Sequence, residues 1–235
     1  MMTIRRADDR GRYRNDWLDS RHTFSFGEYY DPAHMGVSIL RVINDDRVAA
    51  GAGFPTHPHR DMEIVSYVLD GALEHRDSMG NGSVIRAGDV QRMSAGTGVT
   101  HSEFNPSDEQ PSRFLQIWLL PTERGIEPCY GQKYFGPEEK QGRLRLLVSP
   151  DGADGSIAIN SDARVYGALL DDGEAVVQEF KPGRMGYVQV ARGSIRIGEE
   201  RLDEGDGAAV SGEDRLEISG DSAAEVLLFD LPARD

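Results

Sequence analysis

The feature that most constrains the fold is a succession of short segments in which apolar and polar residues alternate, each ending in glycine, aspartate, asparagine or proline. Such segments fill residues 37–121 and return over 143–235, and the chain has 27 glycines among its 235 residues. Alternation with a period of two indicates β-strands, whereas helix-like apolar spacing is scarce. Many short strands close most readily into barrels or jelly rolls, so the sequence predicts an all-β fold.

The second half resembles a copy of the first. YVLDGALEHRD followed by RAGDVQRMSAG parallels VQVARGSIRIGEERLDEGDGAAVSG, each a strand, a glycine turn, a strand and a Gly-Asp turn into another strand. Residues 122–142 lose the alternation and carry proline, glycine and charge, which is typical of a linker. We therefore expect an N-terminal barrel over 1–121, a linker over 122–142 and a C-terminal barrel over 143–235.

The histidines separate the two halves chemically, because all six precede the predicted linker. Only the first barrel can therefore hold a histidine-ligated metal. His57 and His59 are two residues apart, which places both side chains on one face of a strand, and Pro58 favours a position at the strand entry or sheet edge. His101 and Glu103 repeat this spacing after a glycine-rich approach.

Three imidazoles and a carboxylate would form a mixed nitrogen and oxygen site suited to iron, copper, nickel, manganese or zinc rather than calcium. Glu63 and Asp61 share the parity of His57 and His59, so they compete with Glu103 as a fourth ligand or could orient a ligating imidazole.

Other histidines and aromatic residues leave alternatives open. His75 could line the cavity, lie in a second layer around the metal or cover the outside of the barrel. We expect packing or capping roles for His22 and His34. The aromatic segment before residue 37 is expected to pack as core, with a roof over a pocket for a flat ligand as the alternative; it contains Trp17, Phe24, Phe26, Tyr29 and Tyr30.

Composition excludes several functional classes. The formal net charge is −14, from 40 acidic and 26 basic residues, and such a surface repels a phosphate backbone, so no direct nucleic-acid binding is expected. A single cysteine, Cys129, allows no intrachain disulfide. No stretch approaches the ~18 apolar residues of a membrane span, and the first residues carry no apolar signal region. We expect a cytoplasmic protein without a membrane partner.

The two histidine fragments resemble the signature motifs of the cupin superfamily. The first motif comprises Gly51, His57, His59, Glu63 and Gly71, and the second runs from Gly88 through Gly96 to His101 and Asn105. Ser94 stands where the second motif expects proline, and its histidine lies farther from the glycine than usual. Both departures are those of the pirin family, which the chain also resembles in residues 17–32, 40–46, 56–81, 93–107, 115–121 and 224–232.

The resemblance, which is to bacterial pirin-like quercetin 2,3-dioxygenases, implies a bicupin whose C-terminal barrel holds no metal. It implies one divalent metal on His57, His59, His101 and Glu103, with iron expected first and copper, nickel, manganese, zinc or cobalt as alternatives. The implied substrates are a flavonol, or a related small aromatic compound, and dioxygen, with release of carbon monoxide. Glu103 would then also take the proton of the flavonol 3-hydroxyl as a catalytic base.

Two other functions follow from the same residues. Some pirins resemble metal- or redox-sensing regulators that bind a protein partner, and an acidic surface suits a protein rather than DNA. A closed structural metal in a barrel that only binds a small molecule is a third possibility. A monomer is expected.

Overall fold

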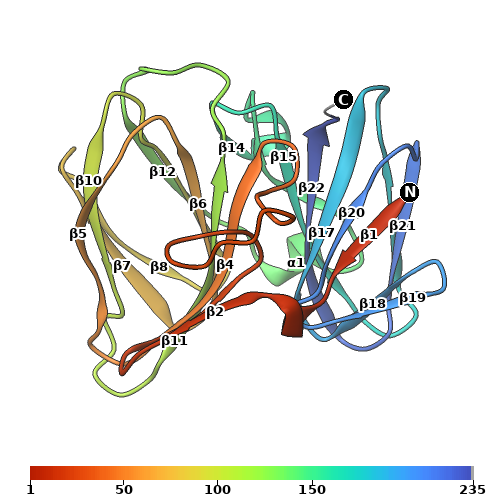
Figure 1. Ribbon diagram of the computed structural model, residues 1–235, viewed down its shortest axis with the longest axis horizontal. Helices are drawn as coiled ribbons and strands as arrows, with labels where there is room; N and C mark the ends of the chain where they lie inside the picture. The colour runs from red at the N-terminus through yellow and green to blue at the C-terminus, as the bar shows by residue number, and fades with distance from the viewer. Residues whose placement is uncertain (234–235) are drawn as a thin grey trace.

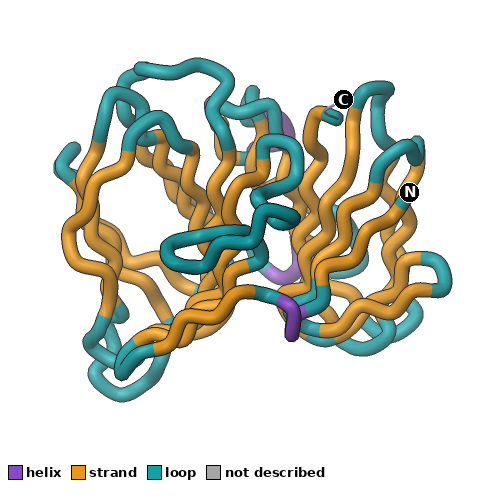
Figure 2. The backbone as a smooth tube through the Cα atoms, viewed as in Figure 1, coloured by secondary structure: helices purple, strands orange, loops and turns teal. Residues whose placement is uncertain are grey.

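The computed structural model describes residues 1–233, and nearly all of its regular structure is β-strand (Figure 2). The helical elements of this range are short: η1 (Ala7–Asp9), α1 (Pro137–Lys140) and η2 (Ala153–Gly155). Within the described range, no helix has the length and apolar character needed to cross a bilayer. The strands form two halves side by side, each built from a large and a small sheet (Figure 1).

The first half pairs a seven-stranded sheet with a four-stranded one. In spatial order the large sheet contains β12 (Cys129–Tyr134), β9 (Asp89–Ser94), β6 (Glu63–Asp70), β11 (Ser112–Leu119), β4 (Leu40–Val48), β3 (Leu18–His22) and β2 (Gly11–Arg14). The small sheet contains β5 (Gly53–His59), β10 (Val99–Phe104), β7 (Ala72–Asp77) and β8 (Gly82–Arg86).

The second half repeats this construction with seven and four strands. Its large sheet contains β1 (Met2–Arg5), β20 (Gly207–Val210), β17 (Arg184–Arg192), β22 (Ala224–Pro232), β15 (Arg164–Leu170), β13 (Arg145–Ser149) and β14 (Ile157–Ala158). Its small sheet contains β16 (Ala175–Glu179), β21 (Arg215–Gly220), β18 (Ser194–Ile197) and β19 (Glu200–Asp203). The prediction of an all-β chain with two barrel-like halves is confirmed.

Two strands belong to other sheets than their positions in the sequence predict. β1 joins the large sheet of the second half, where Met2 pairs with Val210, and Figure 1 shows the N-terminus at that edge. The expected linker contains β12, which pairs with β9 of the first half, Cys129 opposite Ser94. Alternation along a strand does not specify which sheet edge it joins, so neither pairing could be predicted locally. The boundaries at 121 and 143 stay a prediction.

The largest apolar cluster lies between the two large sheets rather than inside either barrel. Val65 and Tyr67 of β6 and Leu115 of β11 face the second half, where Leu227 and Phe229 of β22 meet them in one buried cluster. Both faces of these central strands are therefore buried, as in layered sheets. This packing holds the two halves together.

The interiors of the two barrels differ. Inside the second barrel a continuous apolar cluster includes Val188, Val190 and Leu228. Inside the first barrel the apolar residues divide into two clusters: Leu18, Val48, Val68, Leu73, Ile85 and Phe114 form one, and Ile64, Met93, Ala95 and Val99 form the other. The middle of the first barrel is available to polar side chains.

A buried ion pair links the two halves. Arg113 of β11 donates two hydrogen bonds of 2.9 Å to the Asp45 carboxylate of β4, and a third of 3.2 Å to the carbonyl oxygen of Ala191 in the second half. Arg10 lies 3.8 Å from the same carboxylate. Burial would raise the pKa of Asp45, but the two guanidinium groups lower it below its usual value. Asp45 is therefore the negative charge that two buried arginines share.

Asp45→Asn should lower the free energy of unfolding by up to ~3–5 kcal/mol, because it removes the buried partner of Arg113 and Arg10 and leaves Arg113 only the half-exposed Glu204 at 2.9 Å. Chemical denaturation measures this loss. Glu217→Gln, which breaks the exposed pair with Arg215 at 2.9 Å, is the matched control and should change stability by less than ~1 kcal/mol. Equal losses in the two variants would contradict the inference that burial makes the difference.

Candidate metal centre

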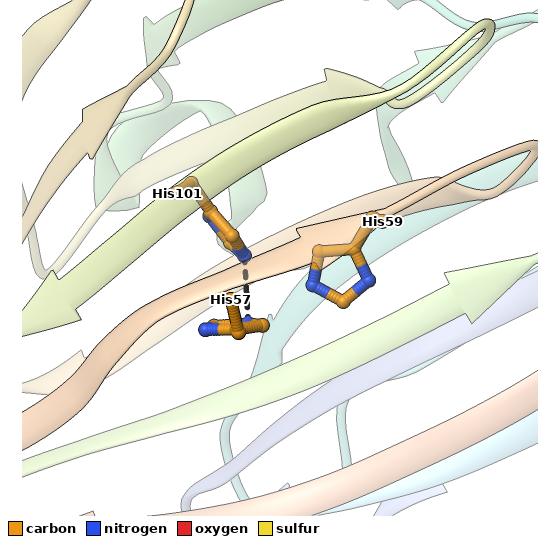
Figure 3. A group of neighbouring side chains, drawn as sticks. All are labelled: His57, His59 and His101. Carbon is orange, nitrogen blue, oxygen red and sulfur yellow. Dashed lines mark hydrogen bonds between the residues drawn. The ribbon is translucent and has the colours of Figure 1, made fainter.

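Three imidazoles meet where β5 and β10 run side by side in the small sheet of the first barrel. His101 lies directly opposite His57 in the antiparallel register, and Val99 lies opposite His59. The ring nitrogens Nε2 of His57 and His101 are 3.0 Å apart, and one nitrogen from each of the three rings lies within 4.8 Å of the others. Figure 3 shows His101 reaching toward His57 from the neighbouring strand, with His59 beside them. The spacing in the sequence predicted this convergence.

Two of the three rings, His59 and His101, are neutral at pH 7. Burial and then the neighbouring imidazoles lower the pKa of His59 to about 4 and that of His101 to about 2. His57 Nδ1 lies 2.8 Å from the carbonyl oxygen of Pro55, which only an N–H can approach favourably, so its Nε2 keeps a free lone pair. Neutral imidazoles with free lone pairs are the form that binds metals.

A second layer of buried side chains lies behind His101. The fully buried His75 places Nε2 3.0 Å from an Asp77 carboxylate oxygen, so Nε2 carries the proton and Nδ1 accepts. Gln91 donates to that Nδ1 at 3.0 Å, and His101 Nδ1 lies 3.4 Å from it. A proton on His101 Nδ1 would share this acceptor with Gln91, and it would leave Nε2 of His101 unprotonated toward His57. Carboxylate and imidazole partners of this kind commonly orient metal-binding histidines.

The arrangement fits a metal ion. With the proton of each ring on Nδ1, His57 and His101 aim lone pairs at each other across 3.0 Å, an arrangement that a cation between them would stabilise. Their separation is less than twice the ~2.0–2.1 Å of a typical metal–imidazole bond, so both nitrogens can reach one ion. The three imidazole nitrogens are therefore placed to bind one cation.

Glu103 lies beside His101 but is held differently. One of its carboxylate oxygens lies within 4.8 Å of ring nitrogens of His75 and His101. Glu103 does not belong to the group formed by His57, His59 and His101. Gln116 donates to one carboxylate oxygen at 2.5 Å and Ser66 to the other at 3.3 Å. Burial and then the nearby Asp46 raise its pKa to about 7. Its role as fourth ligand stays a prediction.

Within residues 1–233, neither Glu63 nor Asp61 forms a hydrogen bond with an imidazole of the cluster. The Glu63 carboxylate accepts from the Ser94 hydroxyl at 2.6 Å, and Asp61 accepts from the backbone of Gly125 at 2.7 Å. The parity argument fails because β5 ends at His59 and β6 begins at Glu63, with Asp61 in a left-handed conformation (φ 47°) between them. Glu63 consequently shares the strand face of Val65, which packs toward the second barrel.

A cavity of about 300 Å³ opens beside the three imidazoles. Trp118 packs edge-on against His59 at 5.0 Å and against Phe26 at 5.3 Å, so aromatic rings form part of its wall. The full lining is Tyr13, Leu18, Ser20, His22, Phe26, Gly27, Glu28, Asn44, Asp46, Phe54, His57, His59, His101, Glu103, Gln116 and Trp118. A flat, mainly apolar molecule with polar groups suits such walls.

The N-terminal aromatic segment divides between core and cavity. Phe24 belongs to the cluster between the large sheets, Phe26 lines the cavity, and Tyr30 is 72% exposed. His34 pairs with Asp31 at 2.7 Å, consistent with a capping role, whereas His22 lines the cavity. The polar residues Asn44, Asp46 and Gln116 were missed because their strands alternate like ordinary half-buried strands.

The fold and site define the class: a two-barrel cupin with a histidine cluster in its first barrel. The family model "Pirin" matches residues 3–119, and the "Quercetinase C-terminal cupin domain" model matches residues 146–231. The chain belongs to the pirin family.

Relatives along the whole chain agree with this assignment. The "Quercetin 2,3-dioxygenase" of Escherichia coli K12 is 49% identical over 233 residues, 99% of each chain. A "Pirin-like protein" of Caulobacter vibrioides is 42% identical over 225 residues, 95% of this chain and 96% of the relative. The bacterial pirin YhhW of Escherichia coli, crystallised in complex with nickel(II), superposes with a TM-score of 0.95 at 47% identity, over 100% of both chains.

Asp77→Asn should weaken metal binding ~10–100-fold, because the amide cannot hold the His75 proton as the carboxylate does and His101 loses its fixed orientation. Titration of the metal-free protein with Ni²⁺ or Zn²⁺ measures the affinity. Glu74→Gln, on the same strand but paired at the surface with Arg76, is the control and should bind as wild type does. Unchanged affinity in Asp77→Asn would contradict the orienting role.

Asp46→Asn should stabilise the metal-free protein at high pH. Burial raises the pKa of Asp46 to about 7, against ~3.9 in an unfolded chain, so between these values only the unfolded state is ionised. The carboxylate therefore destabilises the fold increasingly as pH rises through this window. The gain on substitution should reach at most about 4 kcal/mol above about pH 7 and vanish near pH 4. Urea unfolding at several pH values measures it, and a gain independent of pH would contradict it.

Proposed function

We propose that this protein is a metal-dependent dioxygenase that cleaves flavonols, of the quercetin 2,3-dioxygenase type. The observation that carries the proposal is the cluster of three imidazoles at the wall of a cavity with aromatic sides. The names of its relatives support the same activity. The cavity also argues against a purely structural metal, because a closed structural site needs no adjoining space for a substrate.

His57, His59, His101 and Glu103 would hold one divalent metal. For Glu103 this requires its carboxylate to turn from Gln116 and Ser66 toward the imidazoles. Iron stays the metal expected first from the family resemblance, while the crystallised Escherichia coli relative is in complex with nickel(II). When bound, the metal would supply Lewis acidity and the redox chemistry of the reaction.

The side chains would prepare the substrate. Glu103, with a pKa of about 7, is suited to take the proton of the flavonol 3-hydroxyl. Phe26 and Trp118 would bind the flat ring system and exclude water. Overall, one flavonol and one O₂ would give one carbon monoxide and one depside, the ester that remains after ring cleavage.

The metal-loaded protein should consume quercetin, measured as loss of flavonol absorbance with release of one carbon monoxide per substrate. His57→Ala should lose both bound metal and turnover, whereas His34→Ala, a histidine outside the cluster, should keep both. Elemental analysis identifies the metal. No turnover with any of iron, copper, nickel, manganese, zinc or cobalt would refute the proposed activity.

Glu103→Gln separates the role of Glu103 as base from its role as ligand. If it acts as a base, the variant should lose ~10²–10⁴-fold in turnover while the three imidazoles still retain metal. Metal content and turnover are measured on the same preparation. Full turnover in this variant would remove Glu103 from the mechanism.

A further inference from the structure

A row of polar side chains crosses the interior of the first barrel. In the register of the large sheet, His22 of β3 lies opposite Asn44 of β4, Asn44 opposite Gln116 of β11, Gln116 opposite Ser66 of β6, and Ser66 opposite Gln91 of β9. All five residues are at least 93% buried. Five buried polar residues side by side are unusual where an apolar layer would stabilise the barrel.

One half of this row supports the metal centre. Gln91 donates to His75, and Ser66 and Gln116 donate to Glu103. These three side chains therefore have partners on the facing small sheet. Their burial is explained by the centre described above.

The other half faces the cavity without such partners. Asn44 Oδ1 and His22 Nδ1 are buried and have no hydrogen-bond partner within residues 1–233. Asp46, two residues beyond Asn44 on the same strand face, has an equally unpartnered Oδ1. His22, Asn44 and Asp46 all line the cavity beside the metal centre, and these three residues are 95–98% buried. A buried polar atom without a partner typically costs ~1–3 kcal/mol, so three on one wall indicate a bound group that satisfies them.

We propose that His22, Asn44 and Asp46 form a second binding subsite for hydroxyl groups of an aromatic substrate held at the metal centre. This inference rests on the proposed function and names what the substrate must carry. Asn44 Oδ1 and Asp46 Oδ1 accept hydrogen bonds, so the ligand must donate them. Phenolic hydroxyl groups do so without adding charge.

The charges in the cavity exclude other ligand classes. Its lining residues include three acidic ones, Glu28, Asp46 and Glu103, and no Lys or Arg, so a carboxylate or phosphate would find no cationic side chain there. His22 adds no positive charge, because burial and then Arg10 lower its pKa to about 4. The subsite therefore selects a neutral, polyhydroxylated aromatic compound over an unhydroxylated or anionic one.

Two flavonols test the subsite. Quercetin and 3-hydroxyflavone share the group that would reach the metal, but only quercetin carries hydroxyl groups elsewhere on its rings. Binding to the metal-loaded protein is measured without oxygen, from the shift in flavonol absorbance, so that no turnover is needed. Asn44→Leu and Asp46→Leu, of nearly unchanged size, should each weaken quercetin ~3–10-fold and leave 3-hydroxyflavone within about twofold.

Asp19→Leu is the matched control, because Asp19 precedes Ser20 on β3, does not line the cavity and pairs with Arg12 at the surface. It should leave both affinities unchanged. Equal weakening of both flavonols, or of neither, by Asn44→Leu and Asp46→Leu would overturn the subsite. Failure of the proposed function looks different: the binding difference persists, but quercetin is not consumed when oxygen is admitted.

Discussion

The packing of the two seven-stranded sheets against each other is the interaction on which the rest of the structure depends. It buries the face of β6 and β11 that carries Tyr67 and Leu115 against Leu227 and Phe229 of the second half. Because side chains alternate across a strand, the opposite face of β6 and β11 is left to form the interior of the first barrel. That face carries Ser66 and Gln116, so one strand face stabilises the fold while the other builds the site.

The functional site lowers the stability of the first barrel, because it places polar groups in an interior that is apolar in the second barrel. Asp46 and Glu103 are buried with raised pKa values, and Asn44 has an unpartnered oxygen, each of which lowers stability. The second barrel fills its interior with apolar side chains such as Val188 and Leu228. Destabilising groups gathered inside one barrel, when the interior of the other is apolar, are what a functional site produces.

The histidine cluster could be predicted from sequence because a two-residue spacing within one strand is local information, and both the His57/His59 and the His101/Glu103 pairs have it. The Glu63 parity argument failed because it carried one strand's period through the break at Asp61, where the chain turns. The polar row could not be predicted, since His22, Asn44 and Gln116 become neighbours only through the pairing register of distant strands. A signal was present in the two polar pairs Ser20–His22 and Asn44–Asp46, both spaced as one strand face.

The second barrel also positions the first. β11 carries Gln116, which holds Glu103, and three residues earlier it carries Arg113, which reaches Ala191 of β17 in the second half. The same guanidinium binds Asp45 of β4, next in sequence to both Asn44 and Asp46. One buried arginine therefore ties the strands that carry Gln116, Asn44 and Asp46 to a barrel with an apolar interior. Through this link a half that has no histidine fixes the wall that faces the imidazoles.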